Sequence, residues 1–211
     1  MTIQVKICGL TNLDDTLDAV ELGADYLGFN FYPDSKRFID PIEAKGILQE
    51  VPSSIARIGV FVNADSDLVL DVAVDLNLDY LQFHGDESPE YCNVFGRPWM
   101  KAHRLKDESD LKQLAAYESS WLMVDAYVEK AFGGTGVVSN WDLARMAKKY
   151  GNLFLSGGLK PENIELAINS VWPYAVDVAS GVEDTPGQKN RHKMEEFIMK
   201  AKAASMKPRL A

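Results

Sequence analysis

Cysteine is scarce in this chain, and its scarcity bears on both compartment and chemistry. Cys8 and Cys92 are the only two cysteines in 211 residues, and they lie far apart in the sequence. Two such cysteines do not resemble a disulfide framework, so we expect a reducing, cytoplasmic setting. Cys8 ends the alternating stretch QVKIC and precedes Gly9. A thiol at that position is either a small core residue or a nucleophile or base at the edge of a site.

Long apolar runs and an excess of basic residues are also missing. No stretch approaches the ~20 uninterrupted apolar residues that span a bilayer, and the N-terminus lacks the pattern of a signal peptide. The formal net charge is −9, whereas nucleic-acid phosphates require basic patches on the protein. We therefore expect no membrane and no nucleic acid as partner. A small-molecule substrate remains open, and it can be anionic because a local site can be positive on an acidic protein.

What the sequence does contain is one unit repeated along its length: a short apolar run, a turn and an amphipathic helical pattern. Strands that alternate with helices indicate βαβ units and a parallel sheet. Eight units predict an α/β protein, a (β/α)8 TIM barrel, with residues 1–211 as a single compact domain. An open doubly wound sheet is the alternative, disfavoured because no G-x-G-x-x-G follows the first run. The expected strands are 4–8, 25–32, 56–62, 79–84, 99–104, 121–125, 153–157 and 175–180.

Polar residues occupy the strand positions that should point into the barrel. Alternate residues of a strand face opposite sides, so if Val5 and Ile7 pack under the helices, their neighbours face the lumen. Buried ionisable groups are costly unless they are paired or functional, and this fold holds its catalytic residues at the carboxyl ends of the strands. Their convergence there predicts an active site. The polar residues expected to point inward are Lys6, Cys8, Gln82, His84, Lys101, His103 and Asp125.

Each of the main candidates also has a purely structural interpretation. Cys8 could be a small apolar filler, and His84 could cap the helix that follows it. Asp125 could satisfy loop amides, and Lys6 could pair with a lumen carboxylate such as Asp177. The coincidence of acid-type and base-type groups at the ends of different strands favours a site over these separate roles.

Two glycine-rich turns follow the last two expected strands, within SGGLKPENI and ASGVEDTPG. In this barrel, phosphate is commonly held by the loops after strands seven and eight and by a short extra helix. Gly157 and Gly158 would let backbone N–H groups approach an anion. Ser180 and Gly181 can begin a short helix whose N-terminus favours negative charge. The two turns predict a phosphate site; two tight turns without a ligand are the alternative.

Two further loops extend the candidate site. FYPDSKRFI, after the second run, offers Arg37, whose planar guanidinium can bind a carboxylate through two parallel hydrogen bonds. A surface charge in a polar loop is the alternative. The glycine cluster in EKAFGGTGVVSNWDL, after the sixth run, is long for a βα connection and could close over a substrate as a lid.

Seven stretches stand in a fixed order from residue 5 to about 190: KICGLT, GADYLGFNFYPDSKRFI, GVFVN, LDYLQFHGDE, VDA…GGTG…WDL, LSGGLKPENI and VDVASGVEDTPGQKN. Together they resemble the phosphoribosylanthranilate isomerase family of tryptophan biosynthesis. The chain departs from the family pattern at Asn30, where an aliphatic residue is usual, and at Phe83, which replaces a common leucine. It also lacks the second proline often found before Arg37.

The resemblance implies an Amadori rearrangement of phosphoribosylanthranilate to carboxyphenylamino-deoxyribulose phosphate, without a metal or cofactor. The residue matching Asp125 is the family's general acid and protonates the furanose ring oxygen. The residue matching Cys8 is the general base and removes the proton from the sugar carbon beside the imine. For these roles Asp125 needs a raised pKa, and Lys6 should favour the thiolate of Cys8.

The resemblance also implies the binding residues and the partners. The expected partner is a small phosphosugar, bound by a monomer or a homodimer. The alternatives are a pentose-phosphate epimerase, which needs a His and Asp metal set where this chain has three histidines, the indole-forming enzyme, which needs catalytic Lys and Glu, and a non-catalytic phosphate-binding barrel. The expected substrate-binding residues are Lys6, Arg37, His84, Gly157, Gly158, Ser180 and Gly181.

Overall fold

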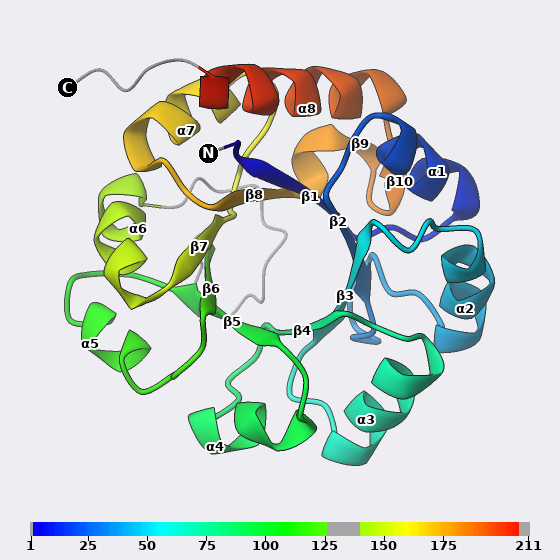
Figure 1. The fold of residues 1–211 in the computed structure, drawn as a ribbon, viewed down its shortest axis with the longest axis horizontal. Coiled ribbons are helices and arrows are strands. Elements are labelled where there is room, and N and C mark those ends of the chain that lie inside the picture. The colour runs from blue at the N-terminus through cyan, green and yellow to red at the C-terminus, as the bar shows by residue number, and fades with distance from the viewer. Residues whose placement is uncertain (1, 126–139, 207–211) are drawn as a thin grey trace.

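The computed structural model describes residues 2–125 and 140–206. Within these ranges eight parallel strands pair in chain order, and the last pairs with the first to close a barrel. Figure 1 looks down the barrel, with the ring of strands at the centre and the helices around it. The TIM-barrel prediction is therefore confirmed. The strands are β1 (Gln4–Cys8), β2 (Tyr26–Asn30), β3 (Ala56–Phe61), β4 (Tyr80–Phe83), β5 (Trp99–Arg104), β6 (Trp121–Asp125), β7 (Asn152–Leu155) and β8 (Ala175–Val178).

Several helices begin where the sequence supplies a capping side chain. Asn12 accepts a hydrogen bond from the backbone N–H of Asp15 at the start of α1, and Asp40 and Asp65 cap α2 and α3 in the same way. Pro41 occupies the first turn of α2, as its fixed φ favours. In the described ranges no helix has the length and apolar character needed to cross a bilayer. The helices are α1 (Leu13–Glu21), α2 (Pro41–Gln49), α3 (Ser66–Asp75), α4 (Pro89–Cys92), α5 (Leu111–Leu114), α6 (Trp141–Ala147), α7 (Ile164–Val171) and α8 (Arg191–Met206), with 3-10 turns η1 (Asn93–Phe95), η2 (Lys148–Tyr150) and η3 (Ser180–Val182).

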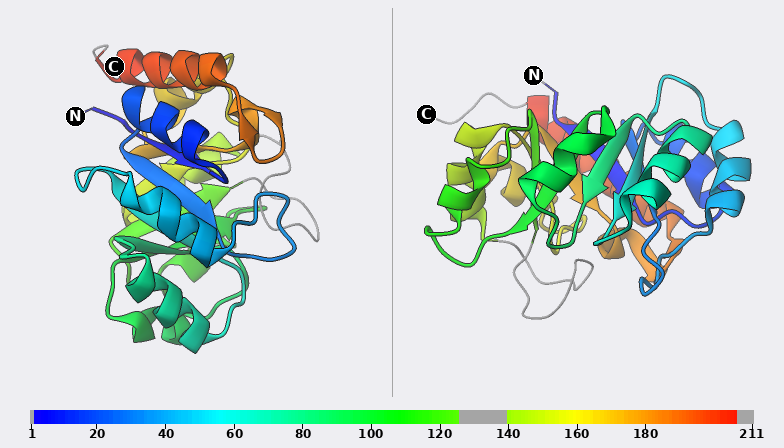
Figure 2. Two further views of the ribbon diagram at one scale, coloured as in Figure 1. Left: turned by 90° about the vertical axis from the view of Figure 1, so that its right-hand side faces the viewer. Right: turned by 90° about the horizontal axis from the view of Figure 1, so that it is seen from below.

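A short antiparallel hairpin stands outside the barrel, between η3 and α8. It consists of β9 (Glu183–Thr185) and β10 (Gln188–Lys189). Both views of Figure 2 show this hairpin, in orange, projecting beside the blue loop that joins β2 to α2. The two segments are far apart in the sequence, so the barrel brings together loops that the linear order separates. The expected short helix after β8 is confirmed as η3.

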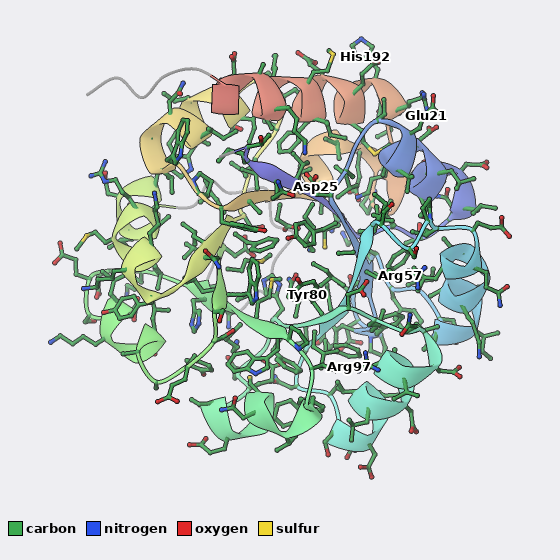
Figure 3. All side chains as sticks on the ribbon, viewed as in Figure 1. Glu21, Asp25, Arg57, Tyr80, Arg97 and His192 are labelled. Carbon is green, nitrogen blue, oxygen red and sulfur yellow. The ribbon has the colours of Figure 1, made fainter. Side chains whose placement is uncertain are left out.

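The apolar side chains form two clusters, one on each side of the strands. The larger cluster lies between the strands and the helices and includes Val5 and Ile7, both fully buried, as predicted. The smaller cluster fills the lumen. Figure 3 shows one of the side chains packed against it, Tyr80, inside the ring of strands. The buried members of the lumen cluster are Tyr26, Ile58, Met100, Ala102, Met123, Phe154 and Ala175.

The side-chain directions predicted for β5 are wrong. Met100 and Ala102 belong to the lumen cluster, so Lys101 and His103 point toward the helices instead. The Lys101 ammonium is buried there, 3.3 Å from the Glu87 carboxylate. His103 packs edge-on against Tyr117, with ring centroids 4.9 Å apart. The buried Glu87 carboxylate, which lies outside the barrel and is not revealed by the strand pattern, offsets the cost of burying the Lys101 ammonium there.

Candidate active site

A cavity opens at the carboxyl ends of the strands, and it brings together most of the predicted site residues. Residues from the ends of β1, β4, β6, β7 and β8 contribute to its wall. These are the positions at which this fold holds catalytic groups. The lining residues are Cys8, Gly9, Asn30, Ser35, Arg37, Val60, Gln82, His84, Asp125, Ser156, Gly157, Gly158, Leu159, Asp177, Val178, Ala179 and Ser180.

Cys8 lies at the end of β1, partly exposed to this cavity. Its neighbour across the sheet is Gly28 of β2. A Cβ atom at Gly28 would lie 2.8 Å from the Cys8 Sγ atom and 3.0 Å from the Lys6 Nζ atom. The missing side chain of Gly28 therefore makes the space in which the thiol and the ammonium lie together.

Lys6 lies beneath the cavity and does not line it. Its side chain is fully buried, and its Nζ atom is 2.6 Å from Oδ1 of Asp177 on β8. The second oxygen, Oδ2, accepts a hydrogen bond of 2.9 Å from the Ser156 hydroxyl. Burial alone would lower the pKa of Lys6, but the Asp177 carboxylate raises it above its ordinary value. Lys6 is thus a permanent cation paired with a lumen carboxylate, as the structural interpretation allowed.

Several opposing effects determine the pKa of Cys8. Burial raises the pKa of the Cys8 thiol above its ordinary value. Lys6 acts in the opposite direction, as predicted, but it only partly offsets burial, and Asp177 raises the thiol pKa further. Burial therefore outweighs Lys6, and the site favours the thiol form of Cys8 over the thiolate.

Asp125 ends β6 and faces the lumen, as predicted. Its Oδ2 atom is 3.0 Å from Nε2 of His84, and Nδ1 of the same ring is 3.0 Å from the amide nitrogen of Gln82. An amide nitrogen donates, so in this arrangement Nδ1 accepts and Nε2 carries the hydrogen that faces Asp125. Gln82 and His84, at the end of β4, therefore orient the Asp125 carboxylate at the end of β6.

The turn that carries His84 is fixed from outside the barrel. Both oxygens of Glu87 accept hydrogen bonds from backbone N–H groups, at 2.8 Å from Asn63 and 2.9 Å from Gly85. Lys101 donates a hydrogen bond of 2.7 Å to the carbonyl oxygen of Gly85. Lys101 thus acts on the site indirectly, by holding the backbone next to His84, and not from the lumen.

The two predicted phosphate turns meet at the next part of the rim. Gly157 and Gly158 line the cavity with φ of +88° and +63°, and Ser180, the first residue of η3, lines it beside them. Gly181 does not line the cavity. A Cβ atom there would lie 1.9 Å from the carbonyl oxygen of Leu159, so Gly181 allows the turn after β8 to contact the turn after β7.

Arg37 reaches the cavity from the loop between β2 and α2, with 13% of its side chain exposed. Its aliphatic part packs on Gly9, where a Cβ atom would lie 2.5 Å from the Arg37 Cδ atom and where φ is +73°. Its Nη2 atom is 2.6 Å from Oε2 of Glu183 in β9. Arg37 is therefore held in place rather than free in solvent, which excludes the interpretation as a surface charge.

Several residues of the site escaped the sequence analysis. Asn30, noted only as a departure from a family pattern, lines the cavity and donates a hydrogen bond to the Ser35 hydroxyl in the loop that carries Arg37. Glu183 and Lys189 lie in a quoted stretch, but the pattern does not reveal their roles, because Arg37, which Glu183 binds, and the Cys8 carbonyl, which Lys189 binds, are more than 140 residues away. The predicted lid, in the stretch after Asp125, lies mostly at 126–139, outside the described residues.

Within residues 2–125 and 140–206, no group of three His, Cys, Asp or Glu side chains is arranged to hold a metal ion. An eight-stranded parallel barrel with a thiol and a carboxylate facing one cavity at its carboxyl rim belongs to the class of TIM-barrel enzymes. Residues 5–200 match the family model of N-(5'phosphoribosyl)anthranilate (PRA) isomerase, and the chain belongs to that family. The family match separates this chain from the other phosphosugar barrels considered above.

Curated relatives and solved structures agree with the family. The N-(5'-phosphoribosyl)anthranilate isomerase of Geobacter sulfurreducens is 48% identical over 200 residues, which cover 95% of this chain and 98% of the relative. The crystal structure of phosphoribosyl anthranilate isomerase from Thermotoga maritima is 41% identical, with a TM-score of 0.89 over 95% of this chain and 99% of that one. A crystal structure of such an isomerase in complex with reduced 1-(o-carboxyphenylamino)-1-deoxyribulose 5-phosphate is 40% identical, with a TM-score of 0.86 over 95% of this chain and 99% of that one.

Proposed function

We propose that this chain is an isomerase that converts phosphoribosylanthranilate into the corresponding carboxyphenylamino-deoxyribulose phosphate. The observation that carries the proposal is the placement of Cys8 and Asp125 on β1 and β6, both facing one cavity in a chain of this family. Arg37 and the turns after β7 and β8 lie around the same cavity. The reaction needs one acid, one base and two anion-binding points, and the cavity supplies a candidate for each.

The chemistry proceeds as two proton transfers that involve Asp125 and Cys8, followed by a tautomerisation in which C1 gains a proton and the C2 hydroxyl loses one. Asp125, protonated, gives its proton to the furanose ring oxygen, and the C1–O bond breaks as the nitrogen lone pair forms an iminium. Cys8, as thiolate, then removes the proton from C2, and those electrons form the C1=C2 bond of an enolamine while the iminium becomes an amine. Tautomerisation of the enol to the C2 ketone places one proton on C1. Each positioned acid or base contributes on the order of 10²–10⁴-fold to the rate.

The remaining residues bind and orient the substrate. Backbone N–H groups at Gly157, Gly158 and Ser180 are proposed to bind the phosphate, and Arg37 to bind the anthranilate carboxylate. His84, which contacts Asp125, holds the acid toward the ring oxygen. Two anion contacts at opposite ends of one substrate fix the sugar between acid and base, and such positioning lowers the entropic part of the barrier.

We further propose that the chain works as a single domain in the cytoplasm, as a monomer or a homodimer. Both cysteines are free thiols, which suits a reducing compartment. One of the related structures is described as monomers generated from a dimeric isomerase of Thermotoga maritima, so the family includes dimers.

The decisive experiment combines genetics with kinetics. Expression of the chain should restore growth of a tryptophan auxotroph that lacks this isomerase, and the purified protein should consume freshly prepared phosphoribosylanthranilate. Cys8→Ala and Asp125→Asn should each lower turnover by about 10²–10⁴-fold and fail to restore normal growth. Binding of the substrate without conversion would instead support the non-catalytic binding barrel.

A further inference from the structure

The hairpin β9–β10 carries two buried charged residues that the reaction scheme does not use. Glu183 and Lys189 are 8% and 7% exposed, and their charged groups are 2.7 Å apart. Neither lines the cavity among the described residues. Burying an ion pair gives little net stability compared with an apolar pair of the same size. Stability alone therefore does not explain why Glu183 and Lys189 are buried.

Glu183 binds one edge of the Arg37 guanidinium. Nε of Arg37 is 2.8 Å from Oε1, and Nη2 is 2.6 Å from Oε2, which is the two-pronged geometry of an arginine–carboxylate pair. A guanidinium has five N–H groups, and this edge uses two of them. The Nη1 group and the second hydrogen of Nη2 form another edge, which is able to hold a second carboxylate in the same way.

Lys189 contributes to the charge of the cluster formed by Arg37, Glu183 and Lys189, and it fixes the position of that cluster. Its Nζ atom lies 2.6 Å from the carbonyl oxygen of Cys8, 3.4 Å from that of Ala179 and 2.7 Å from Glu183. Three acceptors match the three hydrogens of an ammonium, whereas a neutral amine has two. Burial lowers the pKa of Lys189, and the Glu183 carboxylate opposes that shift. With the ammonium held by these three acceptors, Arg37, Glu183 and Lys189 carry a net charge of +1, which one substrate carboxylate can neutralise.

We propose that Glu183 and Lys189 are positioning residues for the carboxylate end of the substrate. Glu183 fixes the rotamer of Arg37 so that the edge formed by Nη1 and Nη2 faces the cavity. Lys189 keeps the group cationic and ties it to the strand end that bears Cys8 and to the residue before Ser180. This inference rests on the proposed function, since it takes Arg37 as the group that binds the anthranilate carboxylate.

The test is a double-mutant cycle of Arg37→Ala and Glu183→Gln on the full chain. Glu183→Gln should raise KM about tenfold or more and change kcat less, because it disturbs binding that ground state and transition state share. In the double variant, Glu183→Gln should add no further loss to that of Arg37→Ala. Asp184→Asn is the matched control: Asp184 lies on the same hairpin but is exposed and pairs with Lys193, so its kinetics should equal those of the unmodified protein.

Two further measurements keep the outcomes separate. With N-(5-phosphoribosyl)aniline, which lacks the carboxylate, Glu183→Gln and the unmodified protein should have equal kcat/KM. Additive losses in the cycle, or an equal loss with the aniline substrate, would show a merely structural role. Thermal melting of the unmodified protein, the three variants of the cycle and Asp184→Asn tests folding. If Glu183→Gln alone unfolds, the comparison moves to Lys189→Met, which should lose kcat/KM with phosphoribosylanthranilate but not with the aniline substrate.

Failure of this inference differs from failure of the proposed function. If the unmodified protein converts phosphoribosylanthranilate and Glu183→Gln behaves like Asp184→Asn, the function stands and the inference is wrong. If the unmodified protein converts nothing, calorimetry with reduced carboxyphenylamino-deoxyribulose phosphate still decides it. Weaker binding to Glu183→Gln than to Asp184→Asn would support the inference, and equal binding would overturn it.

Discussion

The two ends of the barrel lumen are built from the same eight strands, yet they differ in almost every physical property. Toward the amino ends of the strands the lumen holds aromatic rings, with Phe154 in contact with Tyr26, Trp121 and Tyr174 at centroid distances of 5.3 to 6.0 Å. Toward the carboxyl ends it holds a thiol, carboxylates and a buried ammonium. The strands that contribute polar groups to the cavity therefore change from apolar packing to polar side chains over four to six residues. Stability and reactivity are separated along the barrel axis, so they should respond to different substitutions.

The largest expected effect is at the polar end. Cys8→Ala should lower kcat by about 10²–10⁴-fold, because it removes the proposed base, and it should leave the melting temperature nearly unchanged. Cys92→Ala is the matched substitution outside the lumen: Cys92 ends helix α4 and is fully buried in the larger apolar cluster, between the strands and the helices. It should lower stability without changing kcat. Equal kinetic losses in both variants would contradict the assignment of the base.

Phe154→Ala tests the apolar end. The side chain is fully buried in the lumen cluster, and such a truncation typically costs about 3–5 kcal/mol of the free energy of unfolding. Denaturant unfolding measures that loss, while the folded fraction should retain its KM for substrate. Val94→Ala, at an exposed apolar residue, is the control. A large change in KM for Phe154→Ala would show that the two ends are not independent.

Gly28→Ala examines the boundary between the two ends. The added methyl would lie 2.8 Å from the Cys8 Sγ atom, so the thiol must move, and a displacement of about 1 Å can cost roughly 10²-fold in rate. Gly46→Ala in α2 is the control because a Cβ atom there meets nothing within 4 Å. It should stabilise the helix by up to about 1 kcal/mol. Unchanged turnover in Gly28→Ala would mean that the thiol position is not critical.

The smallest expected effect is on the pH dependence of turnover. Because the pKa of Cys8 is raised, the thiolate needed as base forms only as the pH rises, so kcat/KM should increase into the alkaline range. Asp177→Asn removes a charge that raises this pKa and should move the rising limb to lower pH. Lys6→Met removes a charge that lowers it and should move the limb to higher pH. Shifts of the same sign in both variants would contradict this electrostatic account.

The sequence predicted the strands well because a half-buried strand repeats every two residues and a glycine or proline marks its end. It predicted the inward direction of Cys8, His84 and Asp125 because each has clearly apolar neighbours on the opposite parity. The prediction of side-chain direction was wrong at β5, because WMKAHR has apolar residues on both sets of alternating positions. There, the choice depends on Glu87, a partner outside the strand, and no local pattern reports such a partner.

Residues that act over long sequence separations were the hardest to predict. The sequence does not distinguish Glu183 and Lys189 from other charged loop residues, because their roles depend on Arg37 and on the Cys8 carbonyl group. The direction of the Lys6 effect on the Cys8 pKa was predicted correctly, but the larger effect of burial was not, because burial of a thiol depends on packing and cannot be read from adjacent charges. The family resemblance predicts which residues are the acid and the base, but it does not reveal what holds them in place.

The closure of the barrel between β1 and β8 has a consequence for the order in which the protein is made. The ion pair of Lys6 with Asp177 spans 171 residues, and the bond from Lys189 to Cys8 spans 181. A ribosome therefore synthesises more than four fifths of the chain before Asp177, the counter-charge of Lys6, is added. A nascent chain stalled before β8 should bind no substrate analogue, and the site should form only when the last strand and its hairpin have emerged.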